Sequence, residues 1–131
     1  MNNPLAIPHL LVVDDNTVHM VALSNTLMDT GQYQVTAVSS ATEALELVQH
    51  QNFDLILTDL KMPEMDGIDF LRRAREFDHD LVGIVMTGHA AIDTAIEAMK
   101  AGALDYILKP FKLSTILPVL RRGLEMRNLR T

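Results

Sequence analysis

The sequence contains no cysteine, which excludes several classes of site at once. Without thiols the chain can form neither a disulfide framework nor a thiolate zinc site, and it has no cysteine nucleophile. It also lacks any apolar run approaching the ~20 residues that span a bilayer. Residues 1–8 lack the basic stretch of a signal peptide. We therefore expect a cytoplasmic protein that does not insert into membranes.

Basic residues are also scarce, with 11 lysines and arginines against 17 aspartates and glutamates and a formal charge of −6. Such an acidic domain is poorly suited to binding nucleic acid through bulk electrostatics. The acidic excess lies before residue 113, because residues 113–131 carry one acid, Glu125, and several arginines. We expect these arginines to complement the carboxyl end of a final helix and to remain solvated; they are Arg121, Arg122, Arg127 and Arg130.

A length of 131 residues fits one domain, for which roughly 100–200 residues are usual. About five short apolar runs alternate with helix-length segments of amphipathic pattern. The runs occupy residues 9–13, 33–38, 54–58, 81–87 and 104–108, and the helical segments lie near 20–27, 41–50, 68–76, 91–101 and from about 114 onward. Gly83 weakens the fourth run, and Pro118 and Gly123 weaken the last helix. Runs this short and apolar predict an α/β fold with a parallel sheet and right-handed crossovers.

Charged and hydroxyl side chains follow four of the predicted strands. The first run ends at Asp14 and Asp15, the third at Asp59, the fourth at Thr87 and the fifth at Lys109. The carboxyl ends of parallel strands share one edge of the sheet, where ligands bind. Three carboxylates placed together repel one another unless a cation lies among them, and oxygen ligands favour Mg²⁺. One carboxylate can then attack phosphorus, while the lysine and threonine stabilise the phosphoryl oxygens.

Four sequence blocks give the chain a recognisable pattern: Asp14-Asp15 after an apolar run, LTDLKMPEMDG at 57–67, Met86-Thr87-Gly88, and DYILKPF at 105–111. In this order and spacing they resemble the receiver domains of bacterial two-component response regulators over about residues 8–127. The resemblance implies a flavodoxin-like (βα)5 three-layer sandwich, doubly wound around five parallel strands in the order 2-1-3-4-5. It also implies a receiver domain at residues 9–127, with 1–8 as a short lead and 128–131 as the start of a tail or linker.

The resemblance assigns chemical roles to the strand-end residues. Asp59 would be the phosphoacceptor, taking a phosphoryl group from the phosphohistidine of a histidine kinase or phosphotransfer protein. Asp14 and Asp15, with Asp59 and the backbone carbonyl of Lys61, would hold Mg²⁺ or Mn²⁺. Lys109 would contact the phosphoryl group.

Other residues would transmit or tune the phosphorylated state. Thr87 would turn toward the phosphoryl group and Tyr106 would follow it inward, which remodels the surface formed by the fourth helix, fifth strand and fifth helix. That surface would control an output domain or partner protein, or would form a homodimer. The remaining implied positions are Gly88, which leaves room for the phosphoryl group, Pro110, whose peptide bond receivers usually keep cis, and Lys61 and His89, which tune the lifetime of the acyl phosphate.

Each of these residues also has a purely structural interpretation. Asp14 and Asp15 could cap the first helix, Asp59 could be a turn residue, Thr87 could be an N-cap and Lys109 a solvated surface lysine. Tyr106 could simply pack at the sheet edge. We expect the histidines without metal-ligand spacing to be structural; they are His9, His19, His50 and His79.

Alternative functions also follow from the sequence. An aspartyl-phosphate phosphatase would need a second acid two residues after its nucleophile, where this chain has Lys61. A nucleotide- or flavin-binding domain would need a glycine-rich phosphate loop, which is absent. A degenerate receiver, acting only as an interaction module, usually loses acids or the lysine. The isolated domain would not be an enzyme, apart from catalysing its own phosphorylation and dephosphorylation. Its parent protein could be a multidomain regulator, a hybrid histidine kinase or a stand-alone regulator.

Overall fold

The computed structural model describes residues 7–88, 92–109 and 112–130, which form alternating strands and helices. The elements are β1 (His9–Val13), α1 (Thr17–Asp29), β2 (Gln34–Val38), α2 (Ala41–His50), β3 (Leu55–Asp59), α3 (Gly67–Phe77), β4 (Val82–Thr87), α4 (Ile92–Lys100), β5 (Ala103–Leu108) and α5 (Leu113–Arg130). Every predicted strand is present, with its ends within one residue of the expected positions. Among the described residues, no helix combines the length and apolar character needed to cross a membrane.

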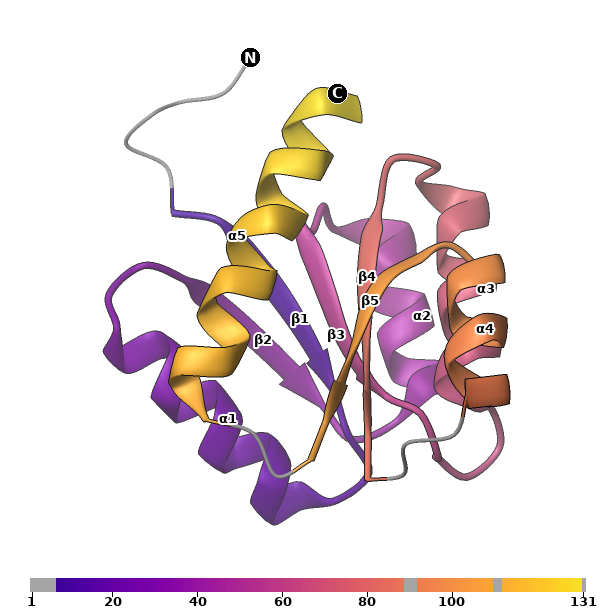
Figure 1. Cartoon of the computed structure of the whole chain (residues 1–131), viewed down its shortest axis with the longest axis horizontal. Helices are drawn as coiled ribbons and strands as arrows, with labels where there is room; N and C mark the ends of the chain where they lie inside the picture. Colours follow the sequence, from indigo (N-terminus) through magenta and orange to yellow (C-terminus); the bar gives the residue numbers. More distant parts are fainter. Residues whose placement is uncertain (1–6, 89–91, 110–111, 131) are drawn as a thin grey trace.

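The strands form one parallel sheet in the order β2-β1-β3-β4-β5, which confirms the expected topology. Figure 1 shows α1 and α5 covering one face of this sheet, while α2, α3 and α4 cover the other. Because β3 lies in the middle, its carboxyl end is flanked by the carboxyl ends of β1 and β4. Residues that follow these strands therefore meet at one edge of the sheet.

Burial on both faces of the sheet explains why the strands are almost entirely apolar. In β1, Leu10 and Val12 pack with α1 and α5, whereas Leu11 and Val13 pack with α2 and α3. All four side chains have 0% exposure. Successive strand residues point to opposite faces, so a strand covered by helices on both sides has no position for a solvated side chain.

Polar side chains determine where the first three helices begin. Asn16 caps α1, because its Oδ1 accepts a hydrogen bond from the backbone N–H of His19 at 3.1 Å. Asp66 caps α3 in the same way, accepting from the N–H of Asp69 at 2.7 Å. The alternative in which Asp14 or Asp15 caps α1 is therefore wrong, and both carboxylates lie at the strand end instead.

Gly83 provides space for a side chain of α3. A Cβ atom at residue 83 would lie 2.2 Å from Cδ1 of Leu71. Leu71 has 0% exposure, and the pairing of β4 with β5 shifts register between Gly83 and Ile84. The expectation that this glycine weakens the strand because it packs against nothing is wrong, since its lack of a side chain is what lets Leu71 reach the sheet.

The final helix contains both residues that were expected to weaken it. Pro118 lies inside α5, beyond the first turn, where it removes one N–H donor. Gly123 faces the sheet, and a Cβ atom there would lie 2.7 Å from Cδ2 of Leu55. Glycine at this position therefore allows α5 to pack closely on β3.

An ion pair ties the last turns of α5 to the residue that ends α3. Nη2 of Arg127 lies 2.8 Å from Oδ2 of Asp78, and the Arg127 side chain is only 13% exposed. The expectation that the arginines of this helix remain solvated is therefore wrong for Arg127. Burial by itself would raise the pKa of Asp78, but the hydrogen bond and charge of Arg127 outweigh burial and hold that pKa below its ordinary value.

We predict that Arg127→Met lowers the free energy of unfolding at pH 7 by about 1–3 kcal/mol, because a partly buried carboxylate loses its partner. The pKa of Asp78 lies below 3.8 in the folded state, so the pair stabilises the fold above about pH 4 and this contribution is lost as the pH falls through the folded pKa. Urea unfolding of the wild type and Arg127→Met at pH 7 and pH 3 measures the difference between their free energies of unfolding, which should be smaller at pH 3.

The control for this prediction is Arg72→Met, which breaks the exposed Arg72–Asp69 pair on α3, where the arginine side chain is 58% exposed. That change should shift the unfolding midpoint much less, because exposed pairs contribute about 0–1 kcal/mol. Identical unfolding curves for the wild type and Arg127→Met at pH 7 would contradict the importance of the Arg127 ion pair.

Candidate functional site

Three carboxylates meet where β1 and β3 end. Asp14 and Asp15 directly follow β1, and Asp59 is the last residue of β3. One oxygen of each residue lies within 4.8 Å of the others. Asp14 is 2% exposed, Asp59 is partly buried and Asp15 is exposed. Like charges at this spacing destabilise one another, so the cluster depends on a cation in its neighbourhood.

Lys109 supplies a positive charge to this cluster from the end of β5. Its Nζ lies 2.8 Å from Oδ2 of Asp14 and 3.3 Å from Oδ1 of Asp59. The backbone N–H of Lys109 donates to the carbonyl of Thr87 at 2.7 Å, which ties the end of β5 to that of β4. Burial alone would lower the pKa of Lys109, but the hydrogen bond to Asp14 and the two negative charges outweigh it and raise that pKa. The ammonium group is therefore held in its charged form between the two carboxylates.

Asp59 has a pKa shifted upward by its surroundings. Burial raises its pKa above 3.8, Lys109 opposes that rise, and the neighbouring Asp14 adds to it. The backbone N–H of Leu60 donates to Oδ1 of Asp59 at 3.1 Å and fixes the orientation of the carboxylate. Asp59 in its ionised form therefore still has unrelieved charge, which a bound cation would stabilise.

The loop between β3 and α3 packs directly on Asp59 because residue 67 is glycine. A Cβ atom at Gly67 would lie 2.2 Å from the carbonyl oxygen of Asp59. In the same loop Glu64 has a φ of +72° and accepts a hydrogen bond from Oγ1 of Thr42 on α2 at 3.0 Å. These contacts hold the loop, and with it Lys61, beside the carboxylates.

A cavity of about 320 Å³ opens beside the carboxylates. It is lined by Asp15, Asn16, His19, Asp59, Lys61, Thr87, Gly88 and Lys109. Thr87 is 5% exposed, so it forms part of the buried wall. No atom of the described residues lies within 4 Å of the position that a Cβ atom would take at Gly88, so this part of the structure leaves open space on that side of the cavity.

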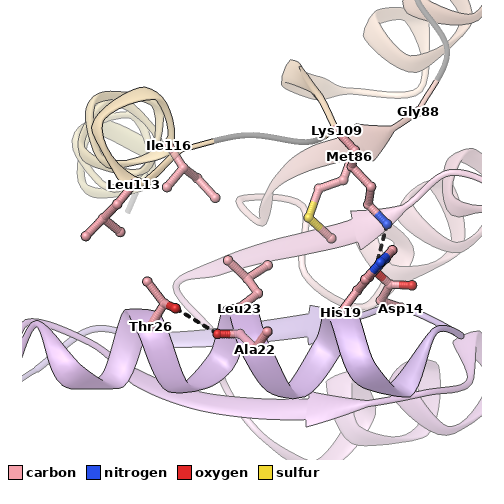
Figure 2. A pocket seen from close by; sticks show the side chains of 10 residues that line it. All are labelled: Asp14, His19, Ala22, Leu23, Thr26, Met86, Gly88, Lys109, Leu113 and Ile116. Atoms are coloured by element: carbon pink, nitrogen blue, oxygen red, sulfur yellow. Dashed lines mark hydrogen bonds and ion pairs between the residues drawn. The ribbon is translucent and has the colours of Figure 1, made fainter.

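A second cavity, of about 520 Å³, lies next to the first and shares His19, Gly88 and Lys109 with it. Figure 2 shows this cavity between α1 and α5, with the Lys109–Asp14 ion pair at one end. The rest of its lining is mostly apolar and includes Ala22, Leu23, Met86, Leu113 and Ile116. The charged site is therefore bordered by an apolar cleft on the side of α1 and α5.

The structure brings together the strand-end residues that the sequence analysis singled out. Asp59 is the last residue of a strand rather than part of a turn. Thr87 is the last residue of β4, and its N-cap alternative falls on the residues before α4 that the structure does not describe, so it stays open. Lys109 is 20% exposed and paired with two acids, so it is not a solvated surface lysine.

For three of the named positions, the roles stay predictions. Tyr106 lies in β5, partly buried against the cluster of Leu71 and Val85, a placement that suits both a packing and a switching role. His89 and Pro110 lie outside the described residues, so the lifetime role of the first and the cis peptide of the second stay predictions.

Two residues of the cavity wall, Asn16 and His19, are not predicted by the sequence pattern. His19 lacks metal-ligand spacing, which favours a structural interpretation, yet it lines both cavities. A usable indication was its distance along the chain: it follows the Asp14-Asp15 pair within the first turn of the next helix. A residue in the first turn of a helix lies near the end of the strand that directly precedes that helix.

The donor set of this site fits a hard divalent cation. Three carboxylate oxygens lie close together, and in the described part of the chain neither sulfur nor imidazole belongs to that cluster. Mg²⁺ is usually bound by one or two carboxylates and keeps further positions for water or phosphate oxygens. The arrangement of acids, one ammonium and an open cavity therefore suits the binding of a phosphoryl group with a metal ion.

Comparisons with known proteins agree with this geometry. Residues 10–121 match the family model described as the response regulator receiver domain. The transcriptional regulatory protein ZraR of Escherichia coli K12 is 39% identical over 115 residues, which is 88% of this chain and 26% of that protein. The chain thus spans about a quarter of the length of such curated relatives.

Solved structures give the same fold. The NtrC4 receiver domain, described as a beryllofluoride-activated dimer, is 34% identical with a TM-score of 0.85 and covers 91% of this chain and 98% of its own. The receiver domain of the sensor histidine kinase PA1611 from Pseudomonas aeruginosa PAO1 contains a magnesium ion in its active site cleft. It is 30% identical with a TM-score of 0.83, and the match covers 92% of this chain and 99% of that one.

We predict that Asp59→Asn stabilises the fold at pH 7 when divalent cations are removed. The pKa of Asp59 is higher in the folded than in the unfolded state, so its ionisation opposes folding. The gain should appear above the folded pKa and disappear below about pH 3.8. Urea unfolding in a chelating buffer, at pH 7 and below about pH 3.8, measures the free energy of unfolding, with the exposed Asp69→Asn as control. A less stable Asp59→Asn at pH 7 would show that the Lys109 contact outweighs burial.

Proposed function

The chain belongs to the family of response regulator receiver domains, and on this basis we propose that it accepts a phosphoryl group on Asp59. The donor would be the phosphohistidine of a histidine kinase or of a phosphotransfer protein. The observation that carries the assignment to Asp59 is its position at the end of the central strand, within reach of Lys109 and beside two further acids.

The proposed transfer uses the residues of the cavity in distinct roles. An oxygen of Asp59 attacks phosphorus, the bond between phosphorus and the donor nitrogen breaks, and an acyl phosphate forms. The ammonium of Lys109, already 3.3 Å from Oδ1 of Asp59, neutralises a phosphoryl oxygen. Thr87 and the open space beside Gly88 complete the phosphoryl site.

Asp14, Asp15, Asp59 and the backbone carbonyl of Lys61 would hold the metal ion. When bound, Mg²⁺ or Mn²⁺ supplies positive charge to the phosphoryl oxygens. The magnesium ion reported for the PA1611 receiver domain supports this choice of metal. Asp14 and Asp15 have no other role in the transfer, and their side chains need only keep their negative charge facing the cavity.

The output surface would be the face formed by α4, β5 and α5. Ile96, Met99 and Leu108 expose 47%, 40% and 42% of their surface there, and Asp105 of β5 pairs with Arg122 of α5. Thr87 and Tyr106 would couple the phosphoryl group to this face, since they lie on the neighbouring strands β4 and β5. Its occupant would be an output domain, a partner protein or a second copy of the chain.

The parent protein is a separate proposal. Relatives such as ZraR are transcriptional regulatory proteins more than three times as long as this chain, whereas PA1611 is a sensor histidine kinase with a receiver domain. We favour the transcriptional regulator, because the higher identity is to ZraR. The receiver domain would span residues 9–127, and a tail would begin at residue 128. This boundary falls inside α5, which continues to Arg130.

Two rival functions receive less support. A degenerate receiver that acts only through protein contacts would not need the paired geometry of Asp14, Asp59 and Lys109. An aspartyl-phosphate phosphatase would need an acid two residues after Asp59, and the residue lining the cavity there is Lys61.

We predict that Mg²⁺ raises the thermal unfolding midpoint, because the ion binds only the folded arrangement of the three acids. At a concentration of 100 times its dissociation constant the ion would add about 2.7 kcal/mol of stability. Asp15→Asn should lose most of this effect, whereas the exposed Asp69→Asn on α3 should keep it. An equal rise of the unfolding midpoint in the wild type and in Asp15→Asn would show that the metal ion binds at another site.

We predict that acetyl phosphate with Mg²⁺ adds the mass of one phosphoryl group to the wild type and none to Asp59→Asn, as measured by intact-protein mass spectrometry. Asp69→Asn is the matched control and should gain the same mass as the wild type. Removal of Mg²⁺ with a chelator should abolish the reaction, since the phosphoryl charge is then met by Lys109 alone. Modification of Asp59→Asn to the wild-type extent would refute Asp59 as the acceptor.

A further inference from the structure

His19 gives the phosphorylation site an imidazole that the proposed transfer does not use. The residue lies in the first turn of α1, where the N-cap bond from its own backbone N–H to Oδ1 of Asn16 fixes the start of the helix. Its side chain lines both the cavity that contains Asp59 and the neighbouring cleft between α1 and α5. Figure 2 shows the ring pointing from α1 toward the Lys109–Asp14 ion pair. The imidazole therefore belongs to the lining that the two cavities share.

An acyl phosphate at Asp59 also has to be removed, and a group that accepts a proton would accelerate that step. Hydrolysis requires a water molecule to attack phosphorus from the side opposite the Asp59 oxygen. A side chain that takes the proton of that water accelerates the attack. Asp59 ends β3 and lines the same cavity as His19, so a phosphoryl group attached to Asp59 would share that cavity with the imidazole.

Among the described residues that line this cavity, the chemistry leaves few candidates for the proton acceptor. Asp59 is the proposed nucleophile, Asp15 is a proposed metal ligand, and Lys61 and Lys109 are cations. Asn16, Thr87 and Gly88 carry no basic side chain. An imidazole in its neutral form accepts a proton near neutral pH, and His19 is the one such group on the described part of the wall.

We propose that His19 is the general base for hydrolysis of the Asp59 acyl phosphate and thereby shortens the lifetime of the phosphorylated state. A water oxygen forms a bond to phosphorus while one proton of that water passes to the imidazole. The bond between phosphorus and the Asp59 oxygen breaks, which leaves the Asp59 carboxylate and inorganic phosphate. His19 then returns its proton to solvent through the open side of the cavity. This inference rests on the proposed phosphorylation of Asp59.

The experiment measures the half-life of the phosphorylated protein. The wild type and His19→Leu are loaded with acetyl phosphate and Mg²⁺, the donor is removed, and the decay is followed by intact-protein mass spectrometry. Because the decay is taken from protein already phosphorylated, a difference in loading rate does not affect the result. Leucine has good helix propensity, so α1 should be preserved, which circular dichroism can verify. We expect the half-life to lengthen about tenfold or more.

A second measurement separates proton transfer from a structural effect. In deuterium oxide the wild-type decay should slow, because the transferred proton moves in the rate-limiting step, and this isotope effect should be lost in His19→Leu. The matched control is His79→Leu, an exposed histidine in the loop between α3 and β4 that lines neither cavity. It should leave both the half-life and the isotope effect unchanged.

The outcomes distinguish the two proposals. If the wild type takes up no phosphoryl group on Asp59, the proposed function fails and this inference fails with it. If phosphorylation occurs but His19→Leu decays at the wild-type rate, the His19 role alone is overturned. A shorter half-life in His19→Leu would mean that the ring shields the acyl phosphate from water, which also overturns it. Lengthening in His89→Leu without lengthening in His19→Leu would assign the base to His89 instead.

Discussion

The contact on which the site depends is the pair of ionic interactions made by Lys109, at 2.8 Å to Asp14 and 3.3 Å to Asp59. These interactions join the ends of β1, β3 and β5 around one positive charge. Without that charge the three neighbouring carboxylates would repel one another and favour their protonated forms. Burial still raises the pKa of Asp59, so Lys109 offsets the cost of the cluster only in part. The remaining cost is what a divalent cation would relieve, and this links occupancy of the metal site to stability.

The rest of the fold brings these three strand ends together. The order β2-β1-β3-β4-β5 puts Asp59 between the ends of β1 and β4, and helices on both faces keep the strands buried. Two glycines allow the close contacts that this arrangement requires. Gly67 lets the loop between β3 and α3 lie against Asp59, and Gly83 lets Leu71 pack on β4. The ion pair between Arg127 and Asp78 fixes the far end of α5 against the segment after α3. Rigid surroundings of this kind would suit the proposed transmission of a small displacement at the site to the face of α4, β5 and α5.

Much of this arrangement could be predicted from the sequence, because the information is local. Apolar runs that end in charged residues gave the strands to within one residue, and a parallel sheet then requires those ends to share an edge. The features that could not be predicted depend on tertiary contacts. Local pattern does not show that Leu71 fills the space beside Gly83, or that Arg127 meets Asp78 from another element. His19 was missed for a similar reason, since its ring acquires a role only through the cavity that α1, β3 and β5 form together.

The most direct test of the central claim, that Lys109 and the three acids form one phosphoryl-binding unit, is a crystal structure of the protein with Mg²⁺ and beryllium trifluoride as a phosphoryl mimic. We expect beryllium on an oxygen of Asp59, the metal ion between Asp14, Asp15, Asp59 and the carbonyl of Lys61, and Nζ of Lys109 in contact with a fluorine atom. Beryllium trifluoride bound away from Asp59, or a bound mimic with Lys109 still contacting only the two carboxylates, would contradict the account.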